Sequence, residues 1–304
     1  MALVRRPCVA QTRYTVRNHH WLIAMSGLPP VAGRLGWLMA IAVSTIRLAP
    51  AKSPQSGAYS FEAGERVSGP LISCLMVTRG GKLPAAFALD CFRRQSWRNR
   101  ELVIVCDVAD SAIEALVASL GDPTIRYVEA APASLGELRN ISVAHARGDF
   151  LCQWDDDDLY DAGRLEFMMA ALLSHDVAAV FLKRWLIWWP ARRQLAVSGS
   201  RTWEGSMLVG RDVLPAYPAQ ALAEDNITIA RLCSMHATLL IDRPSLYCYI
   251  VHGANSYENA HFETMVSWAS EVISADRYDA QIAALASSLP MTDYASHLAD
   301  GTAW

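Results

Sequence analysis

Short apolar runs alternate with helical segments from Pro70 onward, and this alternation constrains the fold more than any other feature of the chain. We expect buried strands at residues 71–78, 101–107, 124–130 and 150–154. We expect helices between them at 83–96, 111–120 and 134–146. Strands that alternate with helices of this length form right-handed crossovers. The pattern therefore predicts an α/β fold with a mainly parallel central sheet.

Polar side chains stand where these strands end. Thr78 and Arg79 follow the first strand, and Asp107 ends the second. The fourth strand runs directly into four consecutive aspartates, 155–158. The carboxyl ends of parallel strands share one edge of a sheet, which is where such folds bind ligands. We therefore expect these groups to form one site.

The acidic run itself suggests a cation site. Neighbouring carboxylates repel one another unless a cation or solvent relieves them. Asp155 and Asp157 can point to the same side of an extended chain, and their hard oxygen atoms suit Mn²⁺ or Mg²⁺. A solvated turn before a helix near Gly163 is the alternative. An EF-hand is excluded because Tyr160 stands where that loop needs glycine.

Composition narrows the class of protein. Hydrophobic residues make up 52% of the 304 residues and charged residues 19%, which excludes a disordered chain. The net charge of −3 argues against a nucleic-acid partner. The seven cysteines include no CxxC pair, so we expect buried free thiols in a reducing compartment. Neither a GxGxxG nor a GxxxxGK[ST] motif is present, which disfavours dinucleotide and P-loop binding.

The N-terminal segment differs from the rest of the chain. Residues 1–61 hold seven basic residues and no acidic one. The uncharged run between Arg34 and Arg47 has 12 residues, fewer than the ~20 that cross a bilayer. The segment is interpreted as a membrane-surface contact, a poorly ordered extension or upstream sequence that the natural product lacks. The expected localisation is cytoplasmic, with peripheral membrane contact left open.

Five segments from Pro70 to Tyr257 together resemble the family 2 glycosyltransferases of GT-A fold. In order they are LISCLMVTRG, QSWRNRELVIVCD, LGELRNISVAHARGDFLCQWDDDD, ALAEDNITIARL and LYCYIVHGANS. Two departures stand out, because the family commonly has an aromatic-Asn pair at Arg79-Gly80 and Asp-Asp-Gly-Ser after the second strand. The resemblance implies a GT-A domain at 70–257. Charge and composition indicate a basic extension and linker at 1–69, and the pattern of 258–304 indicates a helical segment packed on the domain.

The resemblance also implies roles for the residues that bind the donor. Asp107 would contact the nucleotide base, and Arg139 would lie near the base or the diphosphate, unless it belongs to a solvated helix face. Asp157 would contact the metal directly, and Asp155 would contact the ribose or the water shell of the metal. Asp156 is a further donor-binding candidate. Thr78, Arg79 and Gly205 complete the expected donor site, Gly205 through close approach in the floor under the sugar.

Catalysis is expected near the C-terminal motifs. The resemblance assigns the general base to Asp225, with Glu224 as its competitor; both acids could instead simply favour a helix N-terminus. His252 would complete the metal site, or be structural. Tryptophans at 185, 188 and 189 are interpreted as core packing, with stacking on a sugar acceptor as the alternative.

The implied function is sugar transfer with inversion in polysaccharide or glycan synthesis, dependent on Mn²⁺ or Mg²⁺. The donor would be a nucleotide-sugar, a UDP-sugar first, and the acceptor a glycan or a lipid-linked hydroxyl. Two alternatives remain open. A sugar nucleotidyltransferase would release pyrophosphate, and a non-catalytic nucleotide- or glycan-binding module would keep the fold without turnover.

Overall fold

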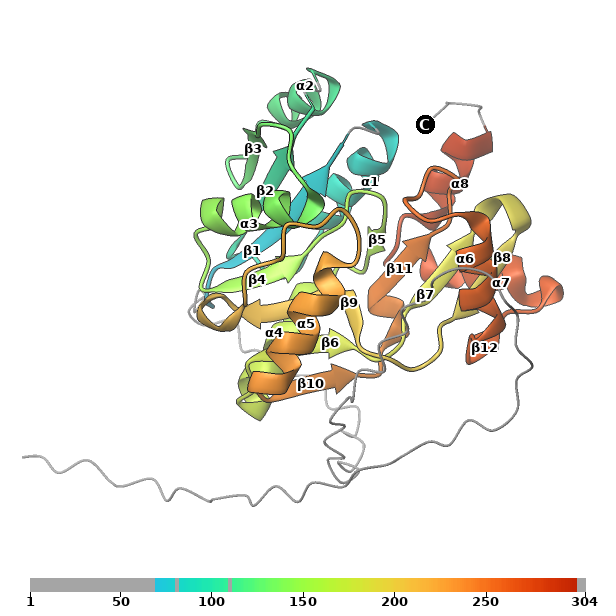
Figure 1. The fold of residues 1–304 in the computed structure, drawn as a ribbon. Coiled ribbons are helices and arrows are strands. Elements are labelled where there is room, and N and C mark those ends of the chain that lie inside the picture. The colour runs from blue at the N-terminus through green and yellow to red at the C-terminus, as the bar shows by residue number, and fades with distance from the viewer. Residues whose placement is uncertain (1–68, 80–81, 109–110, 300–304) are drawn as a thin grey trace, which may run out of the picture. The chain divides into compact units, whose positions relative to one another are not determined.

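A computed structural model describes residues 69–79, 82–108 and 111–299, so the expectations for residues 1–68 lie outside it. A seven-stranded sheet is formed by strands between residues 72 and 241 (Figure 1). Its strands are β1 (Ile72–Thr78), β2 (Arg100–Cys106), β3 (Ile125–Glu129), β4 (Phe150–Gln153), β6 (Ala179–Leu182), β9 (Trp203–Gly210) and β10 (Thr238–Ile241). Their order across the sheet is β10-β6-β9-β4-β1-β2-β3.

The prediction of a mainly parallel sheet is confirmed. Only β9 runs antiparallel to its neighbours, β4 and β6. The remaining pairs, β10-β6, β4-β1, β1-β2 and β2-β3, are parallel. Strand β1 is buried along almost its whole length, as expected for a strand with helices on both faces.

Helices cover both faces of this sheet. They are α1 (Lys82–Arg93), α2 (Ser111–Leu120), α3 (Leu135–His145), α4 (Arg164–His175) and α5 (Glu224–Met235). Side chains of α3 and α5 pack with Leu75, Val103 and Leu151 on one face, whereas α1, α2 and α4 pack on the opposite face. Helix α3 begins with a capping box in which Ser134 and Glu137 satisfy each other's backbone N–H groups.

A second, five-stranded sheet is formed by strands that alternate along the chain with the later strands of the first sheet, and the sequence pattern did not predict it. Its strands are β5 (Leu159–Tyr160), β7 (Leu186–Trp189), β8 (Gln194–Val197), β11 (Tyr247–Ile250) and β12 (Glu271–Val272), in the order β12-β8-β7-β11-β5. Helices α6 (Asn259–Ser267), α7 (Ala275–Leu285) and α8 (Met291–Ala299) accompany it (Figure 1). Single 3₁₀ turns occur at Pro190–Arg192, Arg211–Val213 and Pro244–Leu246.

The tryptophans of β7 and the residues before it belong to the core. Trp185, Trp188 and Trp189 are 2%, 0% and 5% exposed, so the interpretation as packing residues is confirmed. The indole N–H of Trp188 donates to the Tyr278 hydroxyl at 2.8 Å, which ties α7 to the sheet. The prediction of a helical C-terminal segment agrees with α6 to α8, and β12 is an addition to it.

The free thiols agree with the expectation. All six cysteines in the described residues are free, and five of them are buried. Among the described helices, none combines the length and the apolar character that crossing a bilayer requires.

Candidate active site

A cavity of about 760 Å³ opens at the carboxyl ends of β1 and β4. Its volume lies in the range of small-molecule sites. Ten of the eleven residues expected in the site line it: Thr78, Arg79, Arg139, Asp155, Asp156, Asp157, Gly205, Glu224, Asp225 and His252. Asp107 is the exception. Segments that are far apart in the sequence thus meet at the edge of the sheet, as the alternating pattern requires.

The acidic run forms one wall of the cavity. Asp155, Asp156 and Asp157 are half-buried and face it together. Burial and the neighbouring charge of Asp157 raise the pKa of Asp156 to about 8, although a hydrogen bond with Thr78 opposes the shift. Burial also raises the pKa of Asp155, against the opposing charge of Arg139. Ionising these carboxylates together therefore costs free energy. A bound cation would reduce the repulsion between them.

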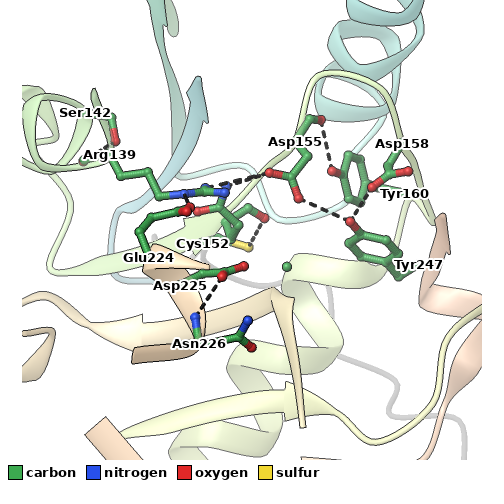
Figure 2. A network of polar contacts seen from close by, with 12 residues as sticks. Arg139, Ser142, Cys152, Asp155, Asp158, Tyr160, Glu224, Asp225, Asn226 and Tyr247 are labelled. Atoms are coloured by element: carbon green, nitrogen blue, oxygen red, sulfur yellow. Dashed lines mark hydrogen bonds and ion pairs between the residues drawn. The ribbon is translucent and has the colours of Figure 1, made fainter. Parts of the chain in front are cut away.

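Asp158 has a different role from its three neighbours, because it anchors the run to the second sheet. It is 1% exposed, accepts a short hydrogen bond from the Tyr247 hydroxyl and accepts another from the Ile250 N–H at 2.9 Å. Burial, followed by the charge of Asp157, raises its pKa. The Tyr160 hydroxyl fixes the start of the run by donating to the Asp155 carbonyl at 3.0 Å (Figure 2).

A buried arginine lies behind the run, and the sequence analysis missed it. The Arg164 side chain is fully buried at the start of α4 and donates to the carbonyls of Gln153 at 3.1 Å and Gly205 at 3.4 Å. Its guanidinium lies 4.6 Å from the ring centroid of Tyr160 and 5.3 Å from that of Tyr247. Cation–π contacts of this kind stabilise a desolvated charge. Arg164 thus supports Gln153, at the end of β4 two residues before the acidic run, and the floor at Gly205.

Gly205 is required by close approach. A Cβ atom at this position would lie 3.1 Å from Asp155 Oδ2 and 3.1 Å from the Tyr247 hydroxyl oxygen. The Tyr247 hydroxyl also donates to Asp155 Oδ2 at 3.3 Å. A side chain at 205 would therefore crowd the Asp155 carboxylate and the Tyr247 hydroxyl, and at least one of them would have to shift slightly.

Arg139 connects two walls of the cavity (Figure 2). Its Nε donates to Glu224 Oε1 at 2.7 Å, and its Nη1 lies 3.7 Å from Asp155 Oδ1. Arg139 is 9% exposed, so the alternative of a solvated helix face is wrong. Burial alone would lower the pKa of the guanidinium, but the charge of Asp155 and the Tyr217 and Glu224 groups outweigh it and raise the pKa.

The two acids at the start of α5 occupy unlike environments. Glu224 is 2% exposed and bound to Arg139, whereas Asp225 is half-buried and lines the cavity. Asp225 Oδ1 accepts from the Asn226 N–H at 2.7 Å. Ala223, just before them, has φ 60° and ψ 20°, a left-handed conformation that alanine adopts at a cost. This turn places both carboxyl groups in the cavity wall.

His252 lies beside the acidic run. Its Nε2 is 3.0 Å from Asp157 Oδ2, and the Ala254 N–H donates to its Nδ1 at 3.2 Å. Because Nδ1 accepts, Nε2 carries the proton and donates to Asp157. The structure thus brings together the His252 and Asp157 side chains, which lie 95 positions apart.

Asp107 lies behind Arg79 instead of facing the cavity. Arg79 Nε and Nη2 donate to the two oxygens of Asp107, each at 3.3 Å. Arg79 Nη2 also donates to the Ala133 carbonyl at 2.8 Å. Asp107 is 7% exposed in its side chain, so it orients the arginine that does line the cavity.

The donor set fits a divalent metal such as Mn²⁺ or Mg²⁺. Within the described residues, no three His, Cys, Asp or Glu side chains are already clustered as a metal site. Mg²⁺, however, is commonly held by one or two carboxylates together with substrate phosphates. The carboxylates of Asp155, Asp156 and Asp157 face an open cavity, and burial, followed by repulsion from Asp157, raises the pKa values of the first two. This chemistry suits an ion shared with a ligand.

Comparison with known proteins points to one family. Residues 73–200 match glycosyl transferase family 2, so this segment of the chain is similar to that family. Over 104 residues the chain is 32% identical to a protein of Escherichia coli (strain K12) named "Putative colanic acid biosynthesis glycosyl transferase WcaA". That alignment covers 33% of this chain and 37% of the relative, so the chain matches little more than a third of the relative's length.

Solved structures show the same fold. The S. aureus TarS 1-349 structure in complex with UDP has a TM-score of 0.50 and 15% identity, over 64% of this chain and 69% of the TarS 1-349 chain. The mannosyltransferase PcManGT from Pyrobaculum calidifontis, in complex with GDP-Man and Mn²⁺, has a TM-score of 0.50 and 16% identity, over 63% and 59% of the two chains. The expected GT-A fold is therefore confirmed.

Proposed function

We propose that this chain transfers a sugar from a nucleoside-diphosphate sugar to an acceptor hydroxyl with inversion, in glycan or polysaccharide synthesis, using Mn²⁺ or Mg²⁺. One observation carries the proposal: three carboxylates at the end of β4 share a cavity with Asp225 and with the Arg139–Glu224 pair. The TarS complex with UDP and the PcManGT complex with GDP-Man and Mn²⁺ support a nucleotide-sugar donor. A UDP-sugar is the first candidate for the donor.

The donor is held by residues at the ends of β1 and β4. Arg79, which is 51% exposed in its side chain, contributes positive charge to the cavity wall and is oriented by Asp107. Asp155 and Asp157 match the two acids of a DxD motif and would hold the metal. His252 lies beside them, with its Nε2 3.0 Å from Asp157 Oδ2. When bound, the ion would neutralise the charge that develops on the leaving diphosphate as a Lewis acid. Arg139 fixes the orientation of Asp155.

Asp225 is the proposed general base. Both acids line the cavity, but Glu224 is 2% exposed and bound to Arg139 at 2.7 Å, whereas Asp225 is half-buried. We therefore assign to Asp225 the removal of the proton from the attacking acceptor hydroxyl, and to Glu224 the positioning of Arg139. Gly205 leaves the floor open for close approach of the donor sugar.

The test combines product analysis with a conservative substitution. With Mn²⁺ and a panel of UDP-, GDP- and dTDP-sugars, the protein should release the nucleoside diphosphate. Asp225→Asn should lower transfer at least about 100-fold and leave UDP binding unchanged. Asp293→Asn, on the exposed side of α8, is the matched control and should keep full activity. Release of pyrophosphate would instead support a nucleotidyltransferase, and turnover that survives Asp225→Asn would remove the assigned base.

A further inference from the structure

Besides the acidic wall, the cavity has an aromatic wall that the proposed mechanism does not use. Trp203, Tyr249 and Tyr257 line it. Trp203 and Tyr249 meet edge to face at 5.6 Å between ring centroids, and Tyr249 continues to Phe262 at 5.7 Å. On its other side Trp203 stacks on Trp185 at 4.3 Å with a 17° angle between the planes. The rings therefore support one another as a rigid surface.

Tyr257 is the most exposed ring of this aromatic wall. It is 42% exposed, although it stacks on the His261 ring at 4.4 Å with a 20° angle between the planes. His261 is in turn held edge to face against Phe262 at 5.4 Å. One face of Tyr257 is thus backed by a second ring. A pre-positioned aromatic face of this kind suits a flat apolar ligand surface, such as the C–H face of a sugar ring.

The surroundings of Tyr257 carry negative charge. Burial, followed by the charges of Asp225 and Glu224, raises the pKa of the Tyr257 hydroxyl, although Arg201 opposes the shift. Arg201 is itself neutralised by an ion pair with Glu204. Asp225 lines the same cavity as Tyr257, so its carboxylate would repel an anionic ligand group stacked there, whereas a neutral ligand would not be repelled.

We propose that Tyr257 is the platform for the acceptor, and that the acceptor presents a neutral sugar ring to it instead of a phosphate or carboxylate. The inference rests on the proposed function, because Tyr257 and Asp225 line the same cavity and a sugar stacked on Tyr257 would present a hydroxyl toward the general base. Tyr257 acts as a specificity-determining residue, and the sugar already present on a growing glycan is the class of acceptor it fits.

The experiment measures sugar binding separately from turnover. Methyl glycosides of glucose, galactose and mannose, and glucose 6-phosphate, are titrated by saturation-transfer difference NMR, with and without UDP and Mn²⁺. At least one methyl glycoside should bind, and glucose 6-phosphate should bind at least about tenfold more weakly than that glycoside. Tyr257→Ala should weaken the binding of the methyl glycoside about three- to tenfold, as expected for the loss of one stacking contact. Tyr257→Phe keeps the ring and should stay within about twofold of the wild type.

Trp268→Ala is the matched control, because Trp268 is 76% exposed and is absent from the cavity lining. It should leave sugar binding unchanged. The inference is overturned if no methyl glycoside binds, if Tyr257→Ala binds as the wild type does, or if glucose 6-phosphate binds as tightly as the neutral glycosides. UDP titration in Mn²⁺ on the same variants separates the two proposals, since retained UDP binding without sugar binding refutes only the acceptor platform.

Discussion

Replacing Arg139 by methionine tests the charge network that joins the two walls of the cavity. The substitution keeps an unbranched side chain but removes the cation that pairs with Glu224 at 2.7 Å and lies 3.7 Å from Asp155. Glu224, at 2% exposure, is then left with a buried and unpaired charge. Breaking a buried ion pair by removing one partner costs about 3–5 kcal/mol of the free energy of unfolding. We expect a loss in this range.

A double-mutant cycle identifies the cause of that loss. Glu224→Gln alone keeps a hydrogen-bond acceptor for Arg139 and should cost about 1–3 kcal/mol. Adding Glu224→Gln to Arg139→Met removes the unpaired charge, so the double variant should recover at least about 1 kcal/mol relative to additivity. The assay is urea denaturation followed by circular dichroism, with the free energy of unfolding extrapolated to water.

The matched control is Arg94→Met. Arg94 pairs with Asp90 at 3.5 Å, but both side chains are nearly half exposed, so the loss should stay below about 0.5 kcal/mol. A loss below about 1 kcal/mol for Arg139→Met, or an additive cycle with Glu224→Gln, would refute the claim that the pair is buried and coupled.

Two further predictions concern the acidic run and the second sheet. The pKa of Asp156 lies at about 8 in the folded protein, above the usual value of 3.8, so the folded state binds the extra proton and its stability should fall as pH rises from about 4 to about 8. Without divalent ions the melting temperature should therefore fall over this range, and Asp156→Asn should flatten the slope; an unchanged slope contradicts the assignment. Trp188 is fully buried and bonded to Tyr278, so Trp188→Ala should cost about 3–5 kcal/mol in urea denaturation, against about 1 kcal/mol for Tyr278→Phe. A loss below about 1 kcal/mol for Trp188→Ala would place this ring outside the core.

The sequence pattern predicted the parallel part of the fold because the signals there are local. Strand β4 ends where the acidic run begins, and α3 begins at its capping box, within a residue or two of the expected bounds. The position of strand β9 in the sheet could not be predicted from local signals. Its antiparallel insertion between β4 and β6 depends on pairing with residues more than 20 positions away, which no local periodicity encodes.

The site was predictable as a set of residues but not as a set of contacts. The ends of parallel strands meet at one edge, so Asp155, Asp157 and Arg79 could be placed together from sequence. Nothing in the local pattern showed that Glu224 and Asp225 have different environments. The difference arises because Arg139, on helix α3, forms an ion pair with Glu224. Arg164 was missed for the same reason, since only the packed rings of the second sheet make a buried guanidinium tolerable.

Calorimetric titration of UDP in the presence of Mn²⁺ tests the central claim most directly. The wild type should bind UDP with Mn²⁺ and lose at least about tenfold in affinity when EDTA replaces the metal, since in the proposed function the acidic run and the diphosphate would share the ion. Asp157→Ala should show the weakened affinity even with Mn²⁺ present, whereas Asp279→Ala, whose side chain is 77% exposed, should bind as the wild type does. Binding of UDP that is indifferent both to Mn²⁺ and to Asp157→Ala would contradict the account.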